Sequence, residues 1–130
     1  MEKKLKKLSK RVNNYFYNYL IKFNSSELIA PMKYGLFPGG KKIRSKIIFD
    51  VGKIFKVKNK YLMVLAASVE TIHAYSLIHD DLPCMDDDKL RRGKPSTHIK
   101  FGEASAVLAG SSLLTLAFEI IADKKYILNS

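Results

Sequence analysis

The chain has 130 residues, with 23 Lys and Arg against 12 Asp and Glu, so its formal net charge is +11. This length fits one modest domain or part of a larger one. A hydrophobic content of 47% excludes wholesale disorder. The single cysteine, Cys84, excludes an internal disulfide and a thiolate zinc cage, so we expect a reducing, cytoplasmic setting. The longest chargeless stretch, residues 104–118, is too short and too polar for a transmembrane segment.

The positive charge is concentrated at the start of the chain. Residues 1–23 carry seven Lys and Arg and one Glu. Apolar residues at spacings of three and four predict an amphipathic helix over 2–23, with the lysines on its other face. Polar residues 24–26 then break the pattern, and a short segment follows that Pro31 opens or bends.

The remaining elements are also helical. Isoleucines and valines at helical spacing predict a helix over 41–55. Residues 61–81 contain no Gly or Pro and predict one helix of about 30 Å. Residues 84–100 are polar and predict a loop, and residues 103–122 predict a helix that is apolar almost all round and therefore buried on every side. No stretch alternates with period two, so the fold class is all-α.

Acidic residues cluster where the 61–81 helix ends. Five of the 12 acids lie within nine residues: Asp80, Asp81, Asp86, Asp87 and Asp88. At 100° per residue, Glu70, His73, Asp80 and Asp81 share an arc of roughly 100° on an otherwise apolar helix. Adjacent carboxylates at a helix C-terminus repel each other by roughly 1 kcal/mol in water, so we expect a cation nearby. Carboxylate oxygens suit Mg²⁺ or Mn²⁺. The alternative is a solvated acidic surface.

Two other metal sites fit the acidic segment less well. The spacing of ligands, glycine and glutamate that a calcium EF-hand loop requires is absent from it. His79 and Cys84 lack two further zinc ligands in order. We therefore expect His79 to pack or to support neighbouring ligands.

A first basic element lies at the start of the 41–55 helix. Gly39 and Gly40 precede Lys41 and Arg44, which are three residues apart and can face the same way. Free backbone N–H groups at a helix start favour anions. Residues 35–42 come close to a nucleotide P-loop, but Lys42 replaces the hydroxyl that binds Mg²⁺ and no buried strand precedes the loop.

A second basic element, Arg91-Arg92-Gly93-Lys94, follows the acids. Only four basic residues of the chain are Arg, and three of them are Arg44, Arg91 and Arg92. The guanidinium group offers a rigid fork for bidentate phosphate contact, which lysine lacks. The alternative is charge balancing within an exposed loop. Together, the acidic and basic elements indicate two phosphorylated ligands, one bound through metal and one through bases alone.

These motifs resemble those of the trans-prenyl diphosphate synthase family, in particular of its bacterial farnesyl diphosphate synthases. The matching segments are GGKKIR at 39–44, residues 70–73, and SLIHDDLPCMDDDKLRRGKP at 76–95, which resembles the family's first aspartate-rich motif. The similarity covers most of residues 30–118. It implies a partial antiparallel helical bundle of the isoprenoid synthase type, with residues 1–130 forming a single incomplete domain.

The resemblance also implies an activity and its residues. It implies condensation of isopentenyl diphosphate with an allylic diphosphate, dimethylallyl or geranyl, in a Mg²⁺-dependent reaction that forms farnesyl diphosphate. Asp80, Asp81 and Asp86 then form the catalytic set, in which Asp80 and Asp86 ligate Mg²⁺. Arg91 corresponds to the arginine that holds the allylic diphosphate. The residues that correspond to those holding isopentenyl diphosphate are Lys41, Arg44, His73 and Arg92. Tyr75, five residues before Asp80, resembles the pattern of enzymes that make a fifteen-carbon product.

The sequence departs from the family pattern in two places. Ser45 stands where the family commonly has proline, and the second aspartate-rich motif would lie beyond residue 130. The closing residues 123–130 look like a truncation, and the helix over 104–118 would then be short of neighbours. The resemblance implies a homodimer for the full bundle.

Two alternatives to an active prenyltransferase remain open. One is a truncated, non-catalytic remnant of the enzyme. The other, suggested by the +11 charge, is a basic helical module that binds nucleic acid. The acidic cluster would repel nucleic-acid phosphates and no reader motif is present, so we expect no nucleic-acid partner.

Overall fold

The computed structural model describes residues 2–37 and 40–123. Pro38 and Gly39 of the predicted glycine loop, and residues 124–130 of the end that looks truncated, lie outside the described residues. The elements in chain order are α1 (Glu2–Leu20), η1 (Ile21–Phe23), α2 (Ile29–Leu36), α3 (Ile43–Ile54), α4 (Asn59–Asp80), β1 (Leu90–Arg91), β2 (Lys94–Pro95), α5 (Thr97–Phe101) and α6 (Glu103–Ala122).

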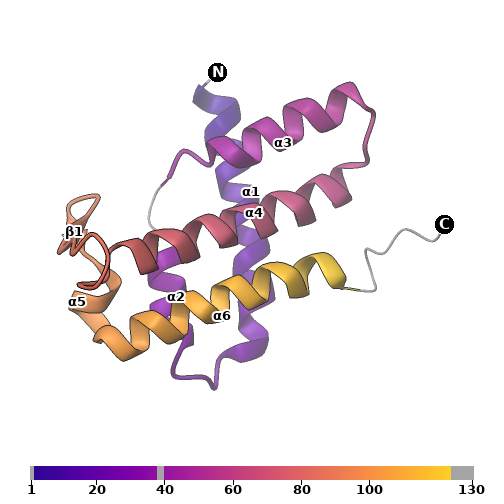
Figure 1. Ribbon diagram of the computed structural model, residues 1–130. Coiled ribbons are helices and arrows are strands. Elements are labelled where there is room, and N and C mark those ends of the chain that lie inside the picture. The colour runs from indigo at the N-terminus through magenta and orange to yellow at the C-terminus, as the bar shows by residue number, and fades with distance from the viewer. Residues whose placement is uncertain (1, 38–39, 124–130) are drawn as a thin grey trace.

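The long helices form an antiparallel bundle with α4 at its centre. Helices α3, α4 and α6 lie side by side in one layer and alternate in direction, while α1 crosses behind them (Figure 1). The short helix α2 packs against both α4 and α6. The all-α bundle that the sequence predicts is confirmed, and the predicted bounds of α6 are those of the structure.

The core lies between this layer and α1. Val12, Phe16 and Leu20 recur along one face of α1 and are fully buried against α2, α4 and α6. The lysines of α1, all of which precede Val12, are exposed, which is the amphipathic pattern that the sequence predicts. Small residues of α4 and α6 let these two helices approach closely, in particular Ala67, Ala74, Ala106 and Ala109.

The expectation that α6 is buried on every side is wrong. Phe118 is 63% exposed and Leu108 is 54% exposed. Within the described chain α6 packs against α2, α4 and α5, which leave one of its sides open. The same holds for the outer face of α3, where Ile54 is 76% exposed. The apolar periodicity therefore marks faces that residues 2–37 and 40–123 leave uncovered, as expected for helices short of neighbours.

The predicted loop over 84–100 contains regular structure. β1 and β2 form a two-stranded antiparallel ribbon in which Arg91 pairs with Lys94. The two residues between the strands, Arg92 and Gly93, have φ of 52° and 75°, as a type I′ hairpin turn requires. Helix α5 follows after Ser96, whose Oγ donates a hydrogen bond to the Asp88 carbonyl at 2.6 Å.

By length and composition alone, α4 and α6 are apolar enough to cross a membrane. They pack against each other along the bundle. A core helix of a globular bundle passes the same test, so this property is weak evidence for a membrane span.

Candidate functional site

The predicted basic residues meet in one pocket. A pocket of about 470 Å³ lies between the start of α3, the middle of α4 and the β1–β2 turn, and we call it the basic pocket. All four residues that the resemblance assigned to isopentenyl diphosphate line it: Lys41, Arg44, His73 and Arg92. Lys41 and Arg44 thus face the same way, as their spacing of three predicts.

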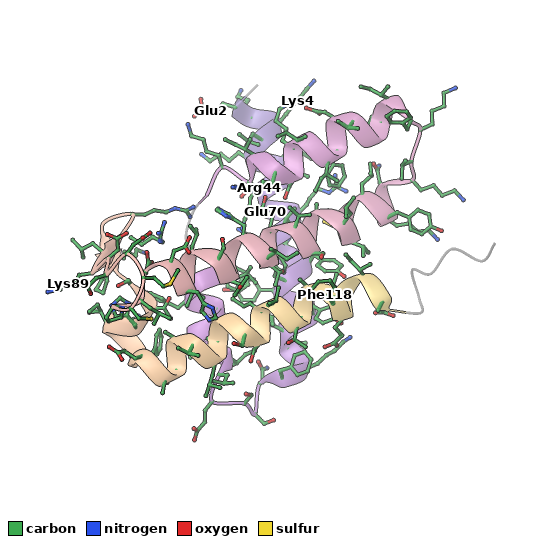
Figure 2. The ribbon with its side chains drawn as sticks, in the orientation of Figure 1. Glu2, Lys4, Arg44, Glu70, Lys89 and Phe118 are labelled. Carbon is green, nitrogen blue, oxygen red and sulfur yellow. The ribbon has the colours of Figure 1, made fainter. Side chains whose placement is uncertain are left out.

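The loop before α3 approaches the hairpin closely. A Cβ atom at Gly40 would lie 3.1 Å from Nη2 of Arg92, so a larger residue would push the guanidinium group away. Glycine at position 40 therefore lets Arg92 lie beside the start of α3. In Figure 2, Arg44 and Glu70 lie next to each other where α3 begins over the middle of α4.

One carboxylate also lines the basic pocket. Glu70 is 4% exposed, and its Oε1 accepts hydrogen bonds from the backbone N–H of Ser45 at 3.1 Å and from the Ser45 hydroxyl at 2.9 Å. Its Oε2 lies 3.8 Å from Nζ of Lys42. Burial lowers the pKa of the Lys42 ammonium, and the charge of Glu70 opposes this change. Both oxygens of the Glu70 carboxylate therefore have partners within the protein.

His73 adds a titratable group to the basic pocket. Partial burial lowers the pKa of its imidazole below the usual 6.5, and the nearby Arg44 guanidinium lowers it further. Both effects favour the neutral form of the imidazole. A bound anion would favour its protonated form, because opposite charges stabilise each other.

A second, smaller pocket adjoins the first. It has a volume of about 30 Å³, and its lining includes Asp81 and Arg91. The Arg91 guanidinium donates two hydrogen bonds to the Asp81 carboxylate, from Nε at 2.7 Å and from Nη2 at 2.6 Å. These hydrogen bonds raise the pKa of Arg91. Asp81 is 1% exposed. The Arg91 guanidinium is therefore a cation beside this carboxylate, as the sequence analysis expected one nearby.

Three of the other acids lie in the exposed turn after α4, and Asp80 is the last residue of the helix. The backbone N–H of Asp86 donates to the carbonyl oxygen of Asp80 at 2.9 Å, which brings the two residues together. Asp86, Asp87 and Asp88 are exposed. Among residues 2–37 and 40–123, no three His, Cys, Asp or Glu side chains are arranged to hold a metal ion.

The polar stripe on α4 therefore divides between two pockets. Glu70 and His73 line the basic pocket, and Asp81 lines the smaller one. Asp80 ends α4 and lines neither of them. Arg92, Gly35 and Leu77 line both pockets, and Arg92 is the basic residue among these three.

His79 packs between α4 and α6, as expected. Its Nε2 lies 3.0 Å from the carbonyl oxygen of Val107, and its ring meets Tyr75 edge-on with centroids 4.8 Å apart. A Cβ atom at Gly110 would overlap this imidazole, so glycine makes room for it. Tyr75 itself packs against the core.

Sequence reasoning missed the roles of Lys42 and Ser45. Lys42 reads as one more lysine of a basic run, but its side chain is buried beneath the pocket. What distinguishes Lys42 is its backbone conformation in the structure, since its φ of 49° is unusual for a residue other than glycine. Glu70 did carry a signal, because a charged residue on a core helix requires a partner.

Comparisons with known proteins give one consistent result. Residues 25–129 match the polyprenyl synthetase family model. The farnesyl diphosphate synthase of Escherichia coli is 54% identical over 101 residues, which are 78% of this chain and 34% of that protein. The farnesyl diphosphate synthase of Buchnera aphidicola (Acyrthosiphon pisum) is 47% identical over 115 residues, which are 87% of this chain and 41% of that protein.

Solved structures agree with the sequence relatives. The geranyltranstransferase of Thermotoga maritima superposes with a TM-score of 0.86 at 36% identity, over 91% of this chain and 44% of that one. An isoprenoid synthase family member from Thermotoga neapolitana gives 0.78 at 40% identity, over 94% and 45%. The chain thus spans less than half the length of these relatives. Its fold is the first part of an isoprenoid synthase bundle, and the chain belongs to the polyprenyl synthetase family.

Proposed function

We propose that this chain forms the first half of the active site of a short-chain trans-prenyltransferase. The reaction is the condensation of isopentenyl diphosphate with dimethylallyl or geranyl diphosphate to give farnesyl diphosphate. One observation carries the proposal: Lys41, Arg44, His73 and Arg92, from distant parts of the chain, converge on one pocket, which adjoins the Asp81–Arg91 pair. The family and the names of the relatives support the same reaction class.

The basic pocket would hold the diphosphate of isopentenyl diphosphate. Arg44 and Arg92 each offer a planar fork that can bind phosphate oxygens in pairs. Lys41 adds a point charge, and His73 gains a proton when an anion binds. Among the described residues that line the pocket, the one carboxylate, Glu70, is paired, so this diphosphate requires no metal ion to screen it from acids.

The acidic turn would hold the allylic diphosphate together with Mg²⁺. Asp80 and Asp86 provide carboxylate oxygens from one turn of chain, and Mg²⁺ commonly binds one or two carboxylates plus substrate phosphates. This donor set fits a metal that arrives with its substrate. Bound Mg²⁺ supplies charge neutralisation for the departing diphosphate. Arg91 uses two of its N–H donors on Asp81, which leaves three for the allylic diphosphate.

The two diphosphates would lie near each other. Arg92 lines the basic pocket and also the small pocket beside Arg91, so a diphosphate in the basic pocket and one held by Arg91 would be neighbours. Holding both reactants in one geometry lowers the entropic barrier to their condensation. The allylic carbon then loses its diphosphate, the isopentenyl double bond attacks it, and loss of a proton gives the trans product.

Further features of the proposed enzyme follow from the resemblance. We propose a cytoplasmic enzyme that is a homodimer when the full bundle is present. We also propose that Tyr75 helps to limit the product to fifteen carbons. The part of the relatives beyond their match to this chain would supply the rest of the metal site, because the chain spans 34% of the Escherichia coli enzyme.

A fusion protein tests this function. Residues 1–122 would be joined to the rest of the Escherichia coli farnesyl diphosphate synthase after the end of α6. We expect the fusion to convert radiolabelled isopentenyl diphosphate and geranyl diphosphate to a fifteen-carbon product when Mg²⁺ is present. Asp80→Asn should abolish turnover, and Asp50→Asn, which changes an exposed acid of α3, should not. A well-folded fusion without turnover would contradict the proposal.

A second candidate, which the sequence leaves open, is a non-catalytic remnant of the same enzyme. The remnant would bind diphosphate in the basic pocket without turning substrate over. The same assay on the 130-residue chain alone tests the remnant. Turnover that Asp80→Ala abolishes would exclude the remnant.

A further inference from the structure

Glu70 places a negative charge among the basic residues that line the basic pocket. Apart from Glu70, every ionisable side chain among the lining residues is a base: Lys41, Lys42, Arg44, His73 and Arg92. A free carboxylate here would repel a diphosphate, and an unpaired buried charge is unfavourable. Glu70 directs one oxygen at Ser45 and the other towards Lys42, so both oxygens have partners within the protein.

Lys42 is turned away from its basic neighbours. Its φ of 49° and ψ of 46° place it in the left-handed region, which a residue other than glycine keeps only where its surroundings fix it. Three contacts fix it here. The Lys42 ammonium donates to the Leu36 carbonyl at 3.3 Å, lies 3.8 Å from Glu70, and sits 5.7 Å from the centre of the Phe16 ring. The backbone kink sends the side chain of Lys42 inward while that of Lys41 is exposed.

Ser45 ties the first turn of α3 to α4. Its N–H belongs to the helix start, where backbone donors have no partner within the helix. The carboxylate of Glu70, 25 residues further along the chain, accepts from this N–H and from the hydroxyl. In Figure 2, Glu70 and Arg44 are seen together at this junction.

The fixed residues and the pocket residues are neighbours in sequence. Lys41 precedes the fixed Lys42, and Arg44 precedes the fixed Ser45. We propose that Glu70 is a positioning residue of the basic pocket, which acts through Lys42 and Ser45 to hold Lys41 and Arg44 in place for a diphosphate. The inference rests on the proposed function, because it assumes that the basic pocket binds diphosphate.

Position 45 offers a direct test. Ser45→Ala removes the hydroxyl bond to Glu70 and keeps the N–H bond. The control is Ser68→Ala, which deletes a buried hydroxyl on the same helix as Glu70. Ser68 Oγ donates to the Ala117 carbonyl of α6 at 2.9 Å, away from the pocket.

The measurement is calorimetric titration of each full 130-residue chain with inorganic pyrophosphate in EDTA, at constant ionic strength. We expect about threefold weaker binding for Ser45→Ala, since this variant loses one hydrogen bond to a charged group. Ser68→Ala should lose thermal stability and keep its affinity. Wild-type affinity in Ser45→Ala, or an equal loss in Ser68→Ala, would overturn the positioning role.

A double variant that removes both charges of the Lys42–Glu70 pair separates a loss of binding from a loss of folding. Glu70→Gln leaves Lys42 buried without its counter-charge and should weaken pyrophosphate binding about tenfold or unfold the chain. The double variant Lys42→Met with Glu70→Gln removes both charges, and we expect it to fold and to recover part of the affinity. A folded double variant that binds no better than Glu70→Gln would contradict the charge pairing. If the folded wild-type chain binds no pyrophosphate, the proposed function itself fails, and this inference fails with it.

Discussion

Two regions of the molecule concentrate positive charge, and only one of them is a built pocket. The second region, which we call the lysine groove, is a groove of about 630 Å³ between α1 and α3. Its charged lining residues are Lys4, Lys7, Arg11, Lys46, Lys53 and Asp50. The groove is larger than the basic pocket and has more cations than acids, so volume and charge alone would favour it as the site.

The two regions differ in what holds their charges. In the basic pocket, Lys41 and Arg44 each adjoin a buried residue that Glu70 fixes. In the lysine groove, the ion pair between Lys46 and Asp50 lies within one helix, four residues apart, and Asp50 is exposed. Exposed pairs of this kind contribute little, because water screens them. Fixed geometry therefore identifies the site better than the number of charges does.

The largest expected effect is the loss of the Arg91–Asp81 pair beside the basic pocket. Arg91→Met leaves the carboxylate of Asp81, 1% exposed, without its partner. We expect a loss of about 2 kcal/mol in the free energy of unfolding, less than the ~3–5 kcal/mol typical of a fully buried pair because the Arg91 side chain is one-third exposed. Urea denaturation measures this. Lys89→Met, in the same exposed turn, is the control, and equal midpoints for the two variants would contradict a structural role for the pair.

The next largest effect is expected on pyrophosphate affinity, when one arginine is removed from each region. Arg44→Gln removes a fork from the basic pocket, and we expect pyrophosphate affinity to fall about tenfold. Arg11→Gln removes the same group from the lysine groove, where Arg11 lies 5.5 Å from the centre of the Phe49 ring. Its affinity should change less than about twofold, since long-range charge is screened at physiological salt. Calorimetry at 0.15 M salt checks both, and equal losses would mean that net charge governs binding.

The sequence predicted the helices and many residues of the basic pocket. The 3.6-residue apolar period predicted the helices, and the family resemblance named together the four residues, Lys41, Arg44, His73 and Arg92, that line the basic pocket. The left-handed Lys42 and the Glu70–Ser45 bonds were not predicted, because they depend on a contact across 25 residues. The exposure of Phe118 was missed for a similar reason, since periodicity marks an apolar face and not what covers it. The metal ligands assigned to Asp80 and Asp86 stay a prediction.

A smaller effect concerns pH in the basic pocket. Partial burial, and next Arg44, lower the pKa of His73 below 6.5 in the folded chain. In the unliganded chain, the contribution of His73 to stability is therefore complete above pH 6.5 and is lost as the pH falls towards the folded pKa. Diphosphate favours the imidazolium, so binding should strengthen as the pH falls, by about threefold between pH 8 and pH 6.

The His73→Gln variant isolates this effect. Pyrophosphate also titrates in this range, so the relevant quantity is the ratio of wild-type to variant affinity at each pH. We expect the ratio to rise as the pH falls, because only the wild type gains a positive charge in the basic pocket. A ratio that stays flat from pH 8 to pH 6 would show that His73 does not protonate on binding.

The smallest effects are expected in the lysine groove. Exchanging Lys46 and Asp50 for glutamine and asparagine removes its exposed ion pair, and we expect no measurable change in the urea midpoint or in pyrophosphate affinity. Single-stranded DNA provides the sharper test, because a surface that attracts phosphates through charge alone releases them steeply as salt rises. We expect any DNA binding to vanish near 0.15 M salt, and to weaken further in a Lys4→Gln, Lys7→Gln double variant, with Arg44→Gln as the matched change in the basic pocket. DNA binding that persists at 0.15 M salt and depends on Lys4 and Lys7 would instead make the lysine groove a second functional surface.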